Sequence, residues 1–395
     1  MSIQLSKRAQ QLKESATLAL AAKAKELQSQ GIDILSLTVG EPDWPTVSAA
    51  AQEAVLAIEE GKTRYTPAAG NVSLRTVIAE QFNQQFKTDY NANNVSVATG
   101  AKYSLFSAFQ SLLDEGDEVI LPNPFWVSYP DMIELCGGKA VTADVQDISM
   151  SPEKQEAFKK SFSKKTKILL LNSPNNPSGL VLSVEDLKFM ASVVQEHPSV
   201  FIICDDIYNL LMLDGSERAP HLLDIAPELK DRILSINGAS KSYAMTGWRM
   251  GWGVGPLFII KAMSSFQSQS TGCPNSIAQS AVEAALKKSA PDVETAKSLL
   301  KARSELFIRE LEKVPHISFV KPQGAFYLWL DVSYYLQKKS WNSDQFCKAL
   351  LEDQQLVIVP GGSFGQDDYV RLSFAVDEKT ILRSVERLHK FLQSL

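Results

Sequence analysis

The sequence is poor in cysteine and histidine, the residues that most often hold disulfides and metal ions. Only four cysteines occur, no two of them in C-x-x-C spacing, and the four histidines do not pair at metal-ligand spacing: Cys136, Cys204, Cys273, Cys347, His197, His221, His316 and His389. This pattern argues against a disulfide scaffold and a zinc site, and it suits a reducing compartment. We therefore expect no metal.

Excess positive charge and long apolar runs are also missing. A formal net charge of -5 without a basic cluster argues against nucleic acid as a partner. No stretch of about 18 apolar residues is present, so no transmembrane helix or membrane partner is expected. Residues 1–28 are rich in charged and amide side chains and lack the apolar core of a signal peptide. The sequence thus predicts a cytoplasmic protein.

What the sequence does contain is a regular alternation of strand-like and helical segments. Helical patterns, such as 104–113, 183–195 and 257–267, separate most of seven short apolar runs: 95–98, 118–121, 139–145, 168–171, 200–204, 233–236 and 252–254. Such alternation predicts a mainly parallel sheet covered by helices on both faces. Ligands of these sheets usually bind at the carboxyl ends of the strands.

The pattern changes after Pro274. One long helical stretch, 276–311, is followed by strand-like segments at 317–320, 326–330, 357–358 and 370–374 and by a last helix. A further short strand is expected at 32–40, after a helix at 16–28. At 395 residues the chain is long for one domain. We expect a large α/β domain over 46–285 and a smaller α+β domain over 286–395, joined by the N-terminal segment 1–45.

Two segments that follow strands suit a flat, phosphorylated ligand. Thr99-Gly100-Ala101-Lys102 opens a helix, and a helix N-terminus offers free N–H groups and a positive dipole end to an anion. Trp126 lies in a proline-stiffened loop, where its ring could stack on a flat ligand. Each feature alone also fits an ordinary turn or core tryptophan, and no G-x-G-x-x-G or Walker sequence follows any strand.

Three further strand ends add polar groups that are harder to explain structurally. Residues 172–179 contain three asparagines, and Asp205-Asp206 ends an apolar strand, where a buried carboxylate needs a compensating partner. Lys241 lies among small residues, with Arg249 eight positions later; read alone, it could be a surface lysine after a strand. Together these groups predict a pocket for a pyridine-type aldehyde that bonds to a lysine, which indicates pyridoxal phosphate.

The residues also resemble a known family, the class I and II aminotransferases of pyridoxal-phosphate fold type I, over nearly the whole chain. The bacterial aspartate and prephenate aminotransferase subgroup is the most similar. The resemblance rests on residues 15–17, 40–43, 65–70, 126–130, 172–179, 205–208, 237–251, 324–327 and 370–373. It implies pyridoxal 5'-phosphate as cofactor and a homodimer with shared active sites.

The resemblance implies a role for each site residue. Lys241 would bond to the cofactor as a Schiff base and carry the proton. Asp205 would pair with the pyridine nitrogen of the cofactor. Tyr208 and Asn176 would bind the phenolic oxygen of the cofactor. Trp126 would stack on the ring. The phosphate would be held by Ala101, Lys102, Ser240, Arg249 and, from the neighbouring subunit, Tyr65.

The substrate is predicted to be an amino acid with two carboxylates. Arg371 and the Gly40 N–H would bind the α-carboxylate beside Trp126 and Asn176, while Lys102, with Ser15 and Thr17, would reach the second one. Lys102 could instead contact only phosphate or solvent. We expect a ping-pong transfer between aspartate or glutamate and 2-oxoglutarate or oxaloacetate.

Prephenate or aromatic substrates stay open as alternatives. A carbon–sulfur lyase would share the same fold and much of the same site. A non-catalytic binding module on this fold is disfavoured because the chain has no basic face for DNA.

Overall fold

In the computed structural model, which describes residues 4–6, 9–10 and 16–395, a seven-stranded sheet organises the larger part of the chain. Its spatial order is β2-β8-β7-β6-β5-β3-β4, and β8 alone runs antiparallel to its neighbours. The strands are β2 (Val95–Ala98), β3 (Glu118–Asn123), β4 (Lys139–Asp144), β5 (Thr166–Asn172), β6 (Phe201–Asp205), β7 (Ile233–Gly238) and β8 (Gly251–Val254). The seven predicted strands and the α/β fold class are confirmed.

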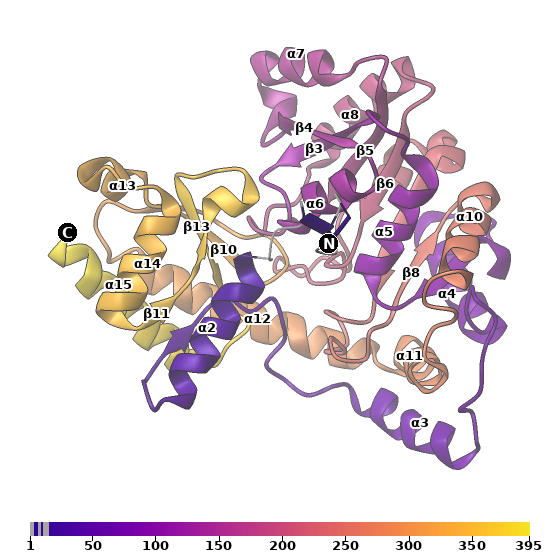
Figure 1. Cartoon of the computed structure of the whole chain (residues 1–395), viewed down its shortest axis with the longest axis horizontal. Coiled ribbons are helices and arrows are strands. Elements are labelled where there is room, and N and C mark those ends of the chain that lie inside the picture. The colour runs from indigo at the N-terminus through magenta and orange to yellow at the C-terminus, as the bar shows by residue number, and fades with distance from the viewer. Residues whose placement is uncertain (1–3, 7–8, 11–15) are drawn as a thin grey trace.

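Helices cover both faces of this sheet (Figure 1). Successive residues of a strand point to opposite faces, so Ile202 and Ile203 of β6 enter two different apolar clusters. One cluster is covered by α5 (Ala101–Leu112), α6 (Ser128–Leu135) and α10 (Leu257–Ser268). The other is covered mainly by α4 (Val72–Phe86), α7 (Pro152–Ser161), α8 (Val184–Glu196), α9 (Leu222–Ile225) and α11 (Ser276–Lys288).

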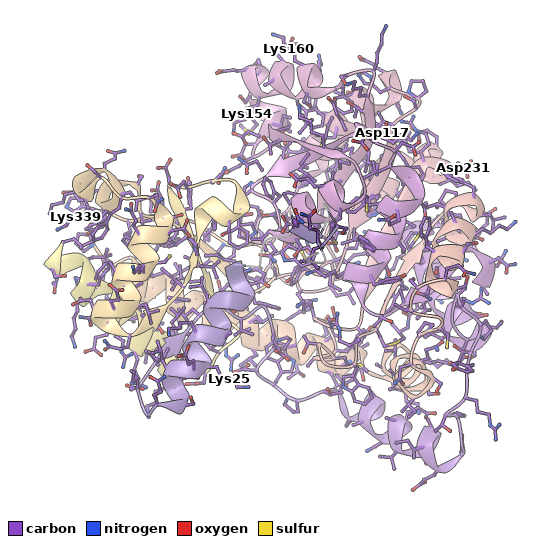
Figure 2. All side chains as sticks on the ribbon, viewed as in Figure 1. Lys25, Asp117, Lys154, Lys160, Asp231 and Lys339 are labelled. Carbon is purple, nitrogen blue, oxygen red and sulfur yellow. The ribbon has the colours of Figure 1, made fainter. Side chains whose placement is uncertain are left out.

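The smaller part has its own sheet and core. Its antiparallel order is β12-β13-β10-β9, formed by β9 (Ser318–Val320), β10 (Tyr327–Asp331), β12 (Val359–Pro360) and β13 (Tyr369–Ser373). Helices α13 (Ser333–Lys339), α14 (Ser343–Gln354) and α15 (Glu378–Ser394) belong to this part. Charged side chains such as Lys25, Lys160 and Lys339 lie on the outer surface, as Figure 2 shows.

The N-terminal segment reaches the smaller part through β1 (Leu35–Ser36), which pairs in parallel with β11 (Leu356–Val357). Helix α2 (Ala16–Ser29) packs beside this pair. The strand expected over 32–40 is therefore wrong in length, because β11 is itself only two residues long and offers no further partner. The domain limits 1–45, 46–285 and 286–395 stay predictions.

The single helix expected over 276–311 is also wrong, since Ser289 separates α11 from α12 (Ala290–Leu311). Pro291 stands in the first turn of α12, where its missing N–H costs no hydrogen bond. The break lets α12 take a new direction and run between the two parts (Figure 1).

An ion pair between Arg303 and Asp43 holds the loop 40–46 against α12. The Arg303 guanidinium donates to both Asp43 carboxylate oxygens, at 2.7 and 2.9 Å. Arg303 is buried, whereas the Asp43 side chain keeps 32% exposure. After this loop comes α3 (Ser48–Glu59), which stands out from the body and packs on α11.

We expect Arg303→Ala to lower the free energy of unfolding by about 2 kcal/mol, because it removes two charge-assisted hydrogen bonds that join the loop to α12. Thermal or urea unfolding measures the loss. The matched control is Lys313→Ala, which breaks an exposed ion pair with Glu310 and should cost under about 0.5 kcal/mol. Equal effects of the two substitutions would contradict the prediction.

Candidate active site

A cavity of about 360 Å³ opens where the carboxyl end of the large sheet meets the smaller sheet. Eleven of the residues predicted from the sequence line it, from segments far apart in the chain: Gly40, Ala101, Lys102, Trp126, Asn176, Asp205, Tyr208, Ser240, Lys241, Arg249 and Arg371. The fold thus brings together nearly all of the predicted site.

Lys241 lies in the turn segment between β7 and β8, three residues after Gly238, the last residue of β7. Its Nζ donates to the Gly40 carbonyl at 2.5 Å. Burial lowers the pKa of Lys241 to about 8, and the nearby Arg371 and Arg249 act in the same direction. An amine with such a pKa is partly neutral near physiological pH and can act as a nucleophile and as a proton carrier.

Asp205 is the last residue of β6, and its carboxylate enters the cavity. Burial raises its pKa to about 6, while a hydrogen bond from the Tyr129 hydroxyl to Oδ2, at 2.6 Å, lowers it. Asn172 Nδ2 donates to the Asp205 backbone carbonyl at 2.9 Å and so fixes the end of the strand. A buried carboxylate of this kind suits a protonated ring nitrogen as partner.

The N-terminus of α5 forms an anion site. Ala101 and Lys102 occupy the first two helical positions, whose N–H groups have no intrahelical acceptor. Gly100 has φ 87°, and a Cβ there would come within 2.6 Å of the Arg249 guanidinium. At Gly251 a Cβ would lie 2.1 Å from the Ala101 nitrogen. Only glycines therefore let β8 and Arg249 approach this helix end.

Arg371, from β13, faces the cavity from the smaller part. It is buried and donates to Asn176 Oδ1 at 2.9 Å and to the Thr38 carbonyl at 2.6 Å. Its guanidinium carbon lies 4.5 Å from the centre of the Tyr327 ring. No carboxylate among the described residues pairs with it, and a buried guanidinium of this kind suits a ligand carboxylate.

Lys102 also lines the cavity, with its Nζ 5.0 Å from the centre of the Trp126 ring. Burial and the neighbouring Arg249 both lower the pKa of Lys102. This contact is a cation–π interaction, and it gives the cavity a further cationic side chain besides Arg371.

Three predicted residues are not placed in the cavity. Tyr65 is 98% exposed and stands outside it. Thr17 belongs to α2, but its side chain, like the whole of Ser15, lies outside the described residues.

Sequence reasoning missed Tyr129, Asn172 and Tyr327 as cavity residues. All three stand in segments that carried the family resemblance, yet no residue pattern indicated which neighbouring side chains they would bond. The described residues hold no cluster of histidine, cysteine or carboxylate side chains fit for a metal ion. Within that same part of the chain, no helix is long and apolar enough to cross a membrane.

Comparison with known proteins gives consistent matches along the chain. The family model for aminotransferase class I and II matches residues 32–388. The aspartate aminotransferase of Geobacillus stearothermophilus is 40% identical over 99% of this chain and 100% of its own length. The aspartate/prephenate aminotransferase of Nitrosomonas europaea is 37% identical over 99% of this chain and 100% of its own.

The solved structures that resemble this one include aspartate aminotransferases as well. The structure of Thermus thermophilus aspartate aminotransferase with maleate has a TM-score of 0.91 and 37% identity, covering 99% of this chain and 100% of its own. A Rhizobium meliloti aspartate aminotransferase has a TM-score of 0.91 and 34% identity, covering 99% of both chains. By sequence and by fold, this chain belongs to the aminotransferase class I and II family.

Proposed function

We propose that this protein is a pyridoxal-phosphate-dependent aspartate aminotransferase. The observation that supports this most is the joint position of Lys241, Asp205 and the α5 N-terminus around one cavity. A nucleophilic amine, a buried carboxylate and an anion site are the three groups that a pyridine aldehyde phosphate requires. Pyridoxal phosphate, when bound, supplies a ring that withdraws electrons from the substrate's α-carbon.

The residues present fit this cofactor. Ala101 and Lys102 N–H groups, Ser240 and Arg249 would hold the phosphate, and glycine at position 100 lets the Arg249 guanidinium reach this place. Asp205 would keep the ring nitrogen protonated, with Tyr129 holding the carboxylate ionised.

Trp126, Tyr208 and Asn176 would complete the cofactor contacts. Trp126 would stack on the ring, and the Tyr208 hydroxyl would donate to the phenolic oxygen. Asn176 Oδ1 already accepts from Arg371, which leaves its Nδ2 hydrogens for the same phenolic oxygen.

Lys241 is proposed as the residue that binds the cofactor and then moves the proton. Its lowered pKa, about 8, allows Nζ to take a proton from the substrate's α-carbon and to return it elsewhere. The contact with the Gly40 carbonyl gives Nζ a defined position near the proposed α-carboxylate site.

The cavity suits a substrate with two carboxylates. Arg371 and the Gly40 N–H would bind the α-carboxylate, and Lys102 would bind the second one. Relatives named for both aspartate and prephenate keep prephenate as a second candidate, because prephenate also carries two carboxylates. A panel of aspartate, glutamate and aromatic donors, with 2-oxoglutarate, oxaloacetate and prephenate as acceptors, separates the two.

We further propose a cytoplasmic homodimer in which each site is completed by the partner. On α3, Ala50, Ala54 and Ala57 are buried, whereas the opposite face exposes Val55 to 56% and Leu56 to 47%. The nearby Tyr65 is almost fully exposed. An exposed apolar helix face beside a proposed phosphate ligand supports a second copy of the chain as its cover.

Replacing Lys241 tests the chemistry. Lys241→Ala should lose the visible absorption band of the cofactor-loaded protein, and turnover should fall by roughly 10³-fold or more, because the proton carrier is gone. Lys261→Ala, at an exposed position of α10, is the control and should behave as the unmodified protein. A Lys241→Ala protein that keeps both band and turnover would refute the assignment.

Replacing Lys102 tests the second carboxylate site. Lys102→Ala should lower kcat/KM for aspartate by about 10- to 100-fold, as expected for the loss of a charge-assisted hydrogen bond. The value for an apolar amino acid should change by less than about 3-fold, since that substrate makes no such bond. Equal losses for both substrates would show that Lys102 contacts only the phosphate.

The dimer is tested by light scattering. The protein should have twice the 43.5 kDa mass of the chain, and Leu56→Lys should shift it toward monomer and reduce activity, because a charge would enter the interface. Leu382→Lys is the control, at 45% exposure on α15. A monomeric, fully active protein would overturn both the dimer and the shared site.

A further inference from the structure

Tyr327, the first residue of β10, is a buried cavity residue to which no role was given above. Its phenolic oxygen lies 2.7 Å from that of Tyr208, and both side chains are buried. A buried hydroxyl needs a hydrogen-bond partner, and here each tyrosine supplies the partner of the other.

Close packing fixes the Tyr327 hydroxyl in one place. A Cβ at Gly40 would lie 2.5 Å from the Tyr327 oxygen, so the backbone of residue 40 touches the hydroxyl directly. On the ring face, the Arg371 guanidinium lies 4.5 Å from the ring centre. The ring also packs against Phe326, with centres 4.7 Å apart. The hydroxyl therefore stays beside Tyr208.

The direction of the bond follows from the proton count. A tyrosine hydroxyl has one hydrogen to donate. If Tyr208 donates that hydrogen to the phenolic oxygen of the cofactor, as proposed above, then Tyr327 must be the donor in the bond between the two tyrosines. A hydrogen bond received by Tyr208 strengthens the one that it donates.

The bond also joins the two parts of the molecule. Tyr327 belongs to the smaller sheet, whereas Tyr208 follows β6 of the large sheet. The Arg371–Asn176 bond crosses between the same two parts. The two side chains of the smaller sheet that make these bonds are neighbours, because the Arg371 guanidinium lies over the Tyr327 ring.

The charged and titratable groups around this pair favour hydroxyls that keep their protons. Burial raises the pKa of both Tyr208 and Tyr327, although Arg371 opposes the shift. Asp205 is the carboxylate that affects Tyr208, and it raises the pKa of the tyrosine further. The Lys241 ammonium lies 5.9 Å from the centre of the Tyr208 ring.

We propose that Tyr327 is a positioning residue that donates to Tyr208 and thereby sets how strongly Tyr208 stabilises the ionised phenolic oxygen of the bound cofactor. This inference rests on the proposed function. Tyr327 itself does not touch the reacting atoms.

The test is Tyr327→Phe, measured in the cofactor-loaded protein without substrate. The pH midpoint at which the visible absorption band changes should rise by roughly half to one unit, because a weaker Tyr208 donor stabilises the ionised oxygen less. Cofactor affinity of the cofactor-free protein, followed by tryptophan fluorescence, should weaken by about 3- to 10-fold.

Two controls separate positioning from packing. Tyr335→Phe removes another buried hydroxyl of the smaller part, which donates to the Pro315 carbonyl, and it should leave the midpoint unchanged. In a Tyr208→Phe background, Tyr327→Phe should add no further shift. An additive shift in the double variant, or a Tyr327→Phe midpoint equal to that of the unmodified protein, would overturn the inference.

If Tyr327→Phe does not fold, Gly40→Ala takes its place, because the added Cβ must displace the Tyr327 hydroxyl. The midpoint should again rise, and an unchanged or lowered midpoint counts against the inference. The proposed function fails separately: in that case the unmodified protein would take up no cofactor and show no visible band at all.

Discussion

The withdrawal of Asp205, Lys241 and Arg371 from water around one small cavity is the constraint on which the rest of the site depends; Asp205 and Arg371 are buried and Lys241 is half-buried. Charged groups removed from water are costly unless hydrogen bonds or opposite charges compensate them. Each of the three has such compensation: Tyr129 donates to Asp205, the Gly40 carbonyl accepts from Lys241, and Arg371 donates to Asn176 and Thr38. All three side chains line the cavity, where their remaining hydrogen-bond donors and acceptors can bind a ligand.

This arrangement explains why the site lies between two sheets. The large sheet supplies the amine, the carboxylate and the anion site, because its parallel strands end at one edge. The smaller sheet supplies the guanidinium and Tyr327. The hydrogen bonds Arg371–Asn176 and Tyr327–Tyr208 then hold the two halves in register at the point where chemistry is proposed.

Glycine sets how closely these segments approach. Gly100 and Gly251 let Arg249 and β8 reach the start of α5, and Gly40 lets the N-terminal loop touch Tyr327. Side chains at these positions would separate the segments and open the cavity. The backbone of Gly40 also positions Lys241, because the Lys241 amine donates to the Gly40 carbonyl.

The sequence by itself determined the large sheet and most of the site. Its seven strands were readable because a strand covered on both faces is a short apolar run between turns. Lys241 and Asp205 were readable because they stand at or just after the ends of such runs. Errors came where local pattern was ambiguous: a proline at the start of α12 does not reveal a change of direction, and the length of β1 depends on β11, more than 300 residues away. Only the tertiary structure decided which buried groups meet, such as Tyr129 with Asp205 and Tyr327 with Tyr208. Those bonds join residues that are 76 and 119 positions apart, and no local periodicity records a contact over such a separation.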